Sequence, residues 1–272
     1  MIGASRASFV EARERLEAAL SATRDAAAFG GELFAVVHLL DREHVLRRAL
    51  SDPAQPADRR AGLATAVLDG NVTPAVRDFV GDVVRQRWAR STELTDALEE
   101  LGVTAIAAAA EAQGRIDDVE DELFRFGRIV EAQPELRGAL VDRRVPGERK
   151  VELVTTLLEG KATAATLQLV SEAVAHPRGR SLERALESYG RIVAERRNRL
   201  VAVVRAAVEL DEAQKTRLTA ALSAQYGRDV HLNIEVDPSV LGGISVQIGD
   251  EEIDGTIARR LEDVRRRIER AS

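Results

Sequence analysis

Residues that could do chemistry are few in this chain, and their spacing forms no familiar reactive group. The four histidines are His38, His44, His176 and His231. No two of them lie at the spacing that places two metal ligands on one helix face. Cysteine is absent, which excludes disulfide bonds, thiolate metal sites and thiol catalysis. His38 with Asp41 or Glu43 could form a site, but an exposed cluster on a helix is the favoured interpretation. We therefore expect no catalytic residues, no metal and no cofactor.

Phosphate-binding motifs are also missing. Gly242-Gly243 lacks the lysine of a nucleotide-binding loop and precedes a strand-like pattern instead of a helix. Basic clusters occupy residues 196–199 and 265–267, but acidic residues interleave with them and aromatic side chains for base stacking are absent. The net charge of −6 argues against a nucleic-acid partner. A solvated face or a contact with an acidic partner helix is the preferred reading of both clusters.

The composition indicates packed helices that would have to position any functional side chain. Of the 272 residues, 45% are hydrophobic, 31% are charged and only 3% are aromatic. Alanine, leucine, valine, glutamate and arginine dominate, as in helical proteins. No apolar run approaches the roughly 20 residues needed to span a bilayer, and no apolar signal core opens the chain. Attachment to a membrane would therefore need another subunit.

Apolar residues recur at helical spacing through most of the chain. The pattern predicts helices over 5–22, 32–40, 43–50 and 59–68, and another that begins at Thr73-Pro74. Gly30-Gly31 is expected to weaken or break the helix pattern. Gly70 is expected to end a helix.

The pattern then returns after a shift of 90 residues, without a gap. Glu32-Leu33-Phe34 becomes Glu122-Leu123-Phe124, and Thr73 becomes Thr163. The shared positions are core and helix-ending residues, so we infer a tandem duplication of one helical bundle. Residues 1–101 form the first copy and residues 102–197 the second. Only Gly102 separates the last helix of the first copy from the first helix of the second, which predicts a nearly continuous shared helix.

Residues 198–272 differ in character. A β-branched run at 200–204 predicts a strand, and Asp211 is expected to cap a helix that reaches about Tyr226 and stops at Gly227. Alternating runs at 230–236 and 244–248 predict a hairpin of two strands, followed by a turn at 249–250 and a final helix at about 256–270. The predicted fold is mainly α, with two tandem helical bundles followed by a small C-terminal α/β domain.

The C-terminal alternating region resembles the signature of a known family. The matching residues are Val230, Leu232, Val236, Asp237, Val240, Gly242, Gly243, Ile244, Val246, Gln247 and Gly249. They are similar to the δ subunit of F-type ATP synthases, the family of the oligomycin-sensitivity-conferring protein. The resemblance covers about residue 103 to the end, with the first bundle as an addition.

The resemblance implies a non-catalytic subunit of the peripheral stalk, or stator, which couples proton-driven rotation to ATP synthesis. In the family, the helical domain binds the N-terminal helix of an α subunit between its first and fifth helices. These correspond here to about 103–114 and 163–175. The apolar candidates are Ile106, Ala109, Ala110, Leu167 and Val170, each of which is also a candidate core residue. Because the chain has an additional N-terminal bundle, it stays open whether one copy or both would hold an α-subunit helix, or whether the first copy contacts a stalk subunit.

The C-terminal domain would join the b-type stalk subunits. The candidate residues there are Val236, Asp237, Val240, Gly242, Gly243, Ile244 and Val246. The resemblance also implies a peripheral position on the cytoplasmic side of the cell membrane, held only through other subunits. Without it, the competing function is a free-standing helical-repeat adaptor that binds amphipathic partner helices.

Overall fold

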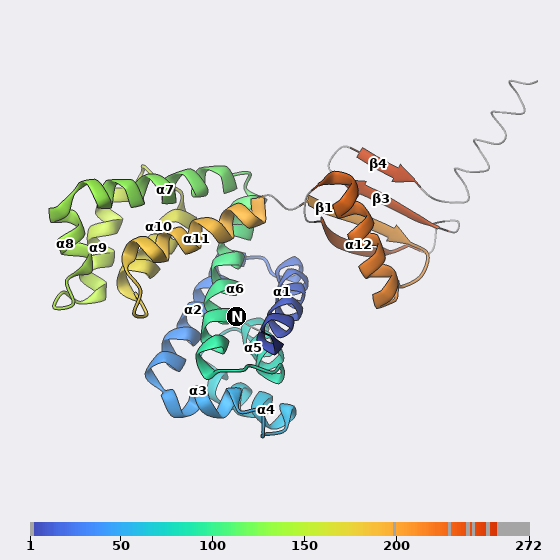
Figure 1. Cartoon of the computed structure of the whole chain (residues 1–272), viewed down its shortest axis with the longest axis horizontal. Helices are drawn as coiled ribbons and strands as arrows, with labels where there is room; N and C mark the ends of the chain where they lie inside the picture. Colours follow the sequence, from blue (N-terminus) through green and yellow to red (C-terminus); the bar gives the residue numbers. More distant parts are fainter. Residues whose placement is uncertain are drawn as a thin grey trace, which may run out of the picture. The chain divides into compact units, whose positions relative to one another are not determined.

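The computed structural model describes residues 3–197, 200–227, 230–237, 240, 243–248 and 251–254. The chain divides into two compact units, Met1–Arg197 and Asn198–Ser272 (Figure 1). The first unit is entirely helical and the second is α/β, so the mainly α fold class is confirmed. Both predicted bundles lie within the first unit, and a division of that unit at residue 101 stays a prediction. None of the described helices is both long and apolar enough to cross a bilayer.

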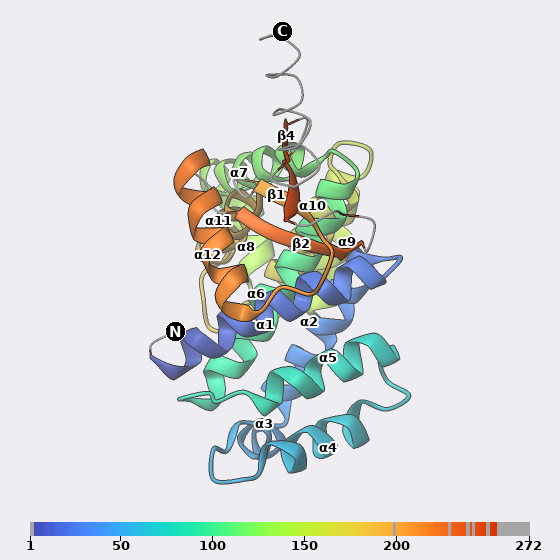
Figure 2. The ribbon, with the colours of Figure 1, turned by 90° about the vertical axis from the view of Figure 1, so that its right-hand side faces the viewer.

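Six helices build the first bundle. They are α1 (Ala4–Ala22), α2 (Ala26–Arg42), α3 (His44–Ser51), α4 (Ala57–Leu68), α5 (Pro74–Arg85) and α6 (Ser91–Ala112). Helices α4 and α5 pack side by side, and α1 contacts both α5 and α6 (Figure 2). The sole tryptophan, Trp88, is buried in this core and donates its indole N–H to the Val83 carbonyl at 3.0 Å. A buried indole with its N–H satisfied is a rigid core element.

The second bundle repeats this order. The rest of α6 is followed by α7 (Ile116–Ala132), α8 (Pro134–Val141), α9 (Gly147–Leu158), α10 (Ala164–Ala175) and α11 (Leu182–Arg197). Equivalent side chains make equivalent contacts. Glu32 Oε2 accepts hydrogen bonds from the Thr73 N–H and Oγ1 at 2.7 and 2.8 Å, and Glu122 Oε2 accepts the same pair from Thr163 at 2.9 Å each. These shared contacts support the duplication.

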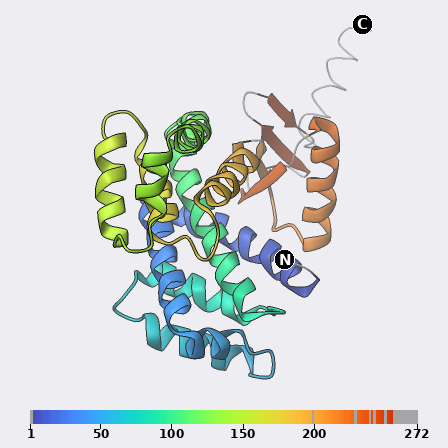
Figure 3. The same cartoon turned by 60° about the vertical axis from the view of Figure 1, so that its left-hand side comes forward.

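Helix α6 belongs to both bundles (Figure 3). It runs unbroken through Gly102, so the prediction of a nearly continuous shared helix is confirmed. Its N-terminal part packs in the first core, through Leu94 and Leu98, and its C-terminal part in the second, through Val103 and Ile106. Two cores built on one helix cannot move apart without bending it.

The expected break at Gly30-Gly31 is wrong, because α2 passes through both glycines. A Cβ atom at Gly30 would lie only 2.7 Å from the Gly102 carbonyl oxygen. The glycine therefore allows α2 and α6 to approach closely, and tertiary packing outweighs its low helix propensity.

The second unit holds β1 (Leu200–Ala206), α12 (Glu212–Tyr226), β2 (Val230–Val236), β3 (Ile244–Ile248) and β4 (Glu251–Asp254). The sheet order is β2-β1-β3-β4, with β1 parallel to β2 and antiparallel to β3. The predicted capping of α12 is confirmed: Asp211 and Gln214 form a capping box, and Gly227 ends the helix at φ 64°.

The predicted hairpin of 230–236 with 244–248 is wrong. Strand β1 lies between β2 and β3, and the observed hairpin joins β3 to β4. Helix α12 supplies the crossover that a parallel β1–β2 pair requires. Ala202 and Val204 of β1 are fully buried, as expected for a central strand. The predicted final helix at 256–270 lies outside the described residues.

Candidate partner-binding surfaces

The predicted groove of the second bundle, between α6 and α10, is covered by α2 of the first bundle. Ile106, Val170 and Ala110 are buried, and Ala109 and Leu167 are half-buried. Phe34 of α2 is 3% exposed and packs into the second core with Val103 and Ile106. These apolar candidates therefore serve an internal contact between the two copies.

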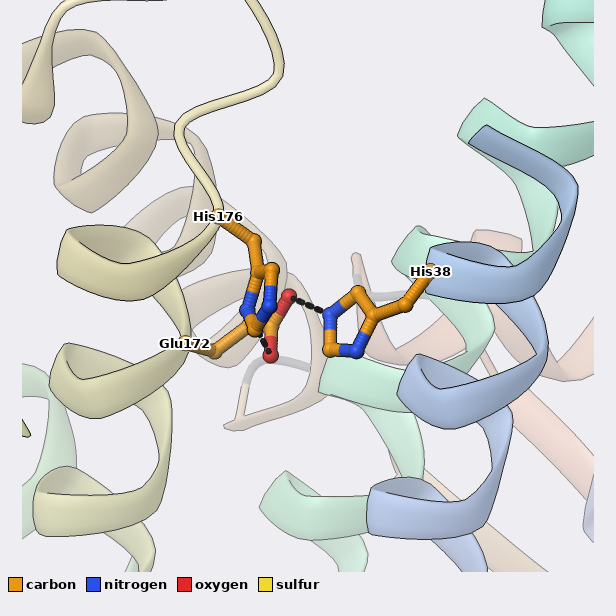
Figure 4. A group of neighbouring side chains, drawn as sticks. All are labelled: His38, Glu172 and His176. Carbon is orange, nitrogen blue, oxygen red and sulfur yellow. Dashed lines mark hydrogen bonds and ion pairs between the residues drawn. The ribbon is translucent and has the colours of Figure 1, made fainter. Parts of the chain in front are cut away.

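Polar contacts also join α2 to α10, and we call this line of contact between the two bundles the seam. Gln168 donates its side-chain amide to the Ala27 carbonyl oxygen at 3.2 Å. One turn further along α10, Glu172 Oε1 accepts a hydrogen bond from His38 Nε2 at 2.7 Å. His176 Nδ1 lies 3.5 Å from the other oxygen of Glu172 (Figure 4). A first-copy helix therefore occupies the place that the resemblance assigned to a partner helix.

His38, Glu172 and His176 are the residues in the described part of the chain whose grouping could hold a metal ion, with ligand atoms within 4.8 Å of one another. The two imidazole rings are stacked with their centroids 3.5 Å apart. Two imidazoles bound to one tetrahedral metal at the usual metal–nitrogen distance would have centroids roughly 5 Å apart. The observed arrangement is instead that of a carboxylate held by two imidazoles.

Glu172 is 8% exposed at the centre of this group. Burial alone would raise the pKa of its carboxyl, but the hydrogen bonds from His176 and His38 outweigh burial and hold the pKa below its ordinary value of 4.5. Sequence analysis missed this cluster, because His38 and Glu172 lie 134 residues apart and neither has a motif around it.

A second polar group extends the seam around Glu99 of α6. Tyr189 donates its hydroxyl to Glu99 at 2.7 Å, and both Arg178 and Arg180 pair with the same carboxylate. Arg178 also reaches Asp41 of α2 at 2.6 Å. Burial and the adjacent Glu99 carboxylate raise the pKa of the Tyr189 hydroxyl, so it stays protonated and donates. This group ties α2, α6 and α11 through buried charge-assisted bonds.

The basic cluster at the end of α11 is used within the chain. Arg196 pairs with Glu17 of α1 and Glu111 of α6, both at 2.7 Å. Arg197 pairs with Glu120 of α7 at 2.9 Å. The expected acidic partner of residues 196 and 197 is therefore this protein's own helical unit. Residues 198–199 and 265–267 lie outside the described residues.

The first bundle has the same surface between α1 and α5, and within the described helical unit several of its α5 residues are more exposed than their equivalents. Ala75, Asp78 and Arg85 of α5 are exposed, whereas their equivalents at 165, 168 and 175 in α10 are half-buried. Of these, Gln168 lies against α2, through its hydrogen bond to the Ala27 carbonyl oxygen. Arg15 and Asp82 join α1 to α5 by an ion pair of 3.4 Å. The positions equivalent to the predicted groove residues are Leu16, Ala19, Leu20, Arg77 and Val80. Leu16 and Val80 are buried and the other three are half-buried.

Two of the predicted stalk-binding residues, Val236 and Ile244, lie at the end of the sheet where β2 ends and β3 begins. Val236 is 49% exposed, while Asp237 donates its N–H to the Ala206 carbonyl oxygen at 2.9 Å and so extends the β1–β2 pairing. Gly243 has φ 94°, which only glycine adopts freely. Val246 is buried, and Ile244 and Val240 are half-buried. Gly242 lies outside the described residues.

The model of the ATP synthase delta (OSCP) subunit family matches residues 103–268, which are the second bundle and the C-terminal unit. ATP synthase subunit delta of Streptomyces avermitilis is 54% identical over 267 residues, with 98% of each chain covered. The same subunit of Thermobifida fusca is 52% identical over 268 residues, covering 98% of this chain and 99% of the relative. That of Acidothermus cellulolyticus is 48% identical over 272 residues. The coverage extends the likeness to the additional N-terminal bundle, and the chain belongs to the ATP synthase delta (OSCP) subunit family.

Proposed function

We propose that this protein is a non-catalytic peripheral-stalk subunit of an F-type ATP synthase. It would hold the N-terminal helix of an α subunit with its helical unit and the b-type stalk subunits with its C-terminal unit. Its place would be at the cytoplasmic face of the cell membrane, through these partners alone. Such a tie resists the torque of the rotor and so couples proton flow to ATP synthesis.

One observation leads us to assign the α-subunit helix to the first bundle. The groove between α6 and α10 of the second bundle is filled by α2, through Ala27, Phe34 and His38. Within the described helical unit, the equivalent α1–α5 surface lacks such a cover, since Asp78 and Ala75 are exposed there. A helix can enter the open surface without displacing packed core residues. Amphipathic helices bind by burying an apolar face in a groove of this kind.

The C-terminal unit suits a second, separate attachment. It has its own core, built from Ala202, Val204, Leu222, Val230, Val246 and Ile248. The exposed Val236 and the bend at Gly243 lie at the same end of the sheet, and this end is where a stalk helix would bind. Replacing Gly243 by Val would strain the backbone at positive φ and should weaken stalk binding while the helical unit stays folded.

Asp78 and Gln168 occupy equivalent positions in the two bundles, so variants at these positions test which bundle holds the α-subunit helix. A labelled peptide of the α-subunit N-terminus would be titrated against the full chain by fluorescence anisotropy. Asp78→Arg on α5 should weaken binding at least tenfold, because it changes the charge on the proposed surface. Gln168→Arg on α10 should leave the affinity within about twofold, because α2 covers that position.

The opposite ranking of the two variants would move the site to the second bundle. If neither the wild-type chain nor either variant bound the peptide, the proposed α-subunit contact would be wrong. Circular dichroism of each variant would verify that helix content is unchanged, so that weakened binding is not loss of fold.

A further inference from the structure

One face of the second bundle lacks the contacts that the equivalent face of the first bundle makes. In the first copy, α2 carries a row of positions that all contact the second copy or α6. They are Ala27, Gly30, Gly31, Phe34, His38 and Asp41. The equivalents on α7 are Asp117, Glu120, Asp121, Phe124, Arg128 and Glu131. All six line a groove of about 550 Å³ between α7 and α11.

The equivalent phenylalanines of the α2 face and the α7 face differ in solvent exposure. Phe34 is 3% exposed, whereas Phe124 is 69% exposed. The same phenylalanine position thus docks a neighbouring bundle in one copy and faces an open groove in the other. A large exposed aromatic at the centre of a groove is typical of a protein-binding site.

Two glycines in the groove have no explanation within the helical unit. Gly127 and Gly190 lie inside α7 and α11, where glycine destabilises a helix relative to alanine. A Cβ atom at Gly190 would meet nothing within 4 Å, and one at Gly127 would meet only Leu186 at 4.0 Å. Internal packing therefore does not require either glycine. A partner helix whose backbone approaches closely would require glycine at these positions, just as the close approach of α6 requires it at Gly30.

The charges of the groove define the occupant. The lining holds six acidic side chains and three arginines, so its balance is negative. Ala27, Gly30 and Gly31 of the first copy are replaced by acidic residues in the second. Arg197 neutralises part of this group through Glu120 and Asp117. Leu123, Phe124, Leu186 and Ala194 supply the apolar part of the lining.

We propose that the α7–α11 groove binds an amphipathic helix of another polypeptide in the assembled complex, with an apolar face against Phe124 and an excess of lysine or arginine. The first copy shows the mode of binding, since α10 and the C-terminal part of α6 lie on the equivalent face of α2. By the same equivalence, the bound helix should place an acidic side chain near Arg128, as Glu172 lies near His38. It should place a basic one near Glu131, as Arg178 lies near Asp41. This inference rests on the proposed function only in taking the assembled ATP synthase as the source of the helix.

The test places a photo-crosslinking phenylalanine analogue at residue 124 in the complex purified from membranes. The control carries the analogue at Val45, which is 74% exposed and lies outside the groove. Mass spectrometry should identify a cross-link from position 124 to a basic helical segment of another subunit, and none to that segment from position 45. A cross-link confined to this chain, for example to residues 256–270, would overturn the proposal, as would an acidic partner segment or no cross-link.

Two groove variants test the same point without the cross-linker. Gly190→Leu fills the groove and Phe124→Asp removes its apolar anchor, so each should reduce the cross-linked segment's affinity for the chain at least tenfold. Gly62→Leu is the control, because Gly62, like Gly190, lies within a helix with no atom within 4 Å of its Cβ position, and it is exposed outside the groove. Equal affinity for all three variants would refute the assignment. Absence of the chain from the purified complex would instead refute the proposed function.

Discussion

The duplication provides a matched pair of phenylalanines for measuring how strongly the two bundles are joined. Phe34 and Phe124 occupy equivalent positions of α2 and α7, but only Phe34 is buried, at 3% exposure against 69%. Truncation of a buried phenylalanine to alanine typically costs about 3–5 kcal/mol, from lost apolar transfer and the cavity left behind. Truncation of an exposed side chain usually changes stability by less than about 0.5 kcal/mol.

Phe34 packs in the second core, whereas Trp88 lies in the first. Tryptophan fluorescence during urea unfolding therefore reports on the first core alone, because Trp88 is the sole tryptophan. If shared α6 makes the two bundles one cooperative unit, Phe34→Ala should lower the free energy of unfolding seen by Trp88 by about 3 kcal/mol or more. Phe124→Ala should leave it within about 0.5 kcal/mol of the wild type.

The measured slope with urea should be the same in all three proteins, so that a shift in midpoint is a change in stability. An unchanged Trp88 transition in Phe34→Ala would show that the bundles unfold independently, and the argument from a shared helix would be wrong. Equal losses in both variants would show that Phe124 is buried in solution.

Three further predictions concern the seam and the groove. Because the pKa of Glu172 is lowered, its contribution to stability is present above pH 4.5 and is lost as the pH falls below that value. Glu172→Gln should therefore be less stable than the wild type at pH 7. In thermal scans from pH 7 to 3, the difference in melting temperature between the two proteins should narrow as the pH falls. Gly190→Ala should raise the free energy of unfolding in urea by up to about 1 kcal/mol. Gly30→Ala should lower it, because the new Cβ would meet the Gly102 carbonyl oxygen at 2.7 Å. The reverse order would contradict the explanation of both glycines. Glu99→Ala leaves Arg178 and Arg180 without their shared carboxylate and should cost about 3–5 kcal/mol by the same measurement, and a loss below 1 kcal/mol would show that the buried network is not a stabilising feature.

Much of the fold follows from local patterns in the sequence. Helical periodicity, the Thr73-Pro74 start and the Asp211 cap specify helices through contacts within a few residues, and these predictions hold. The duplication is visible because core and capping positions recur at one fixed spacing. The family was identified from the residues around the bend at Gly243, where backbone geometry restricts the residue type.

Contacts distant in sequence explain what the patterns missed. Gly30-Gly31 reads as a helix breaker locally, and only the approach of α6 makes it compatible with a helix. The alternating runs at 230–236 and 244–248 predict strands but not their order, which β1 decides by inserting between them. His38 and Glu172 meet only because two copies of one bundle dock against each other. The same docking fills the groove predicted for a partner helix.

The central claim is that this protein ties the catalytic head to the stalk, and the loss of one end of the tie tests it most directly. Membrane vesicles would be prepared with the chain ended after Arg197, where the helical unit stops. ATP-driven proton pumping would then be measured beside ATP hydrolysis in the same vesicles. The account predicts that hydrolysis persists while pumping is lost, because the head is no longer held against the rotor. Full pumping by vesicles that contain the shortened chain would contradict it.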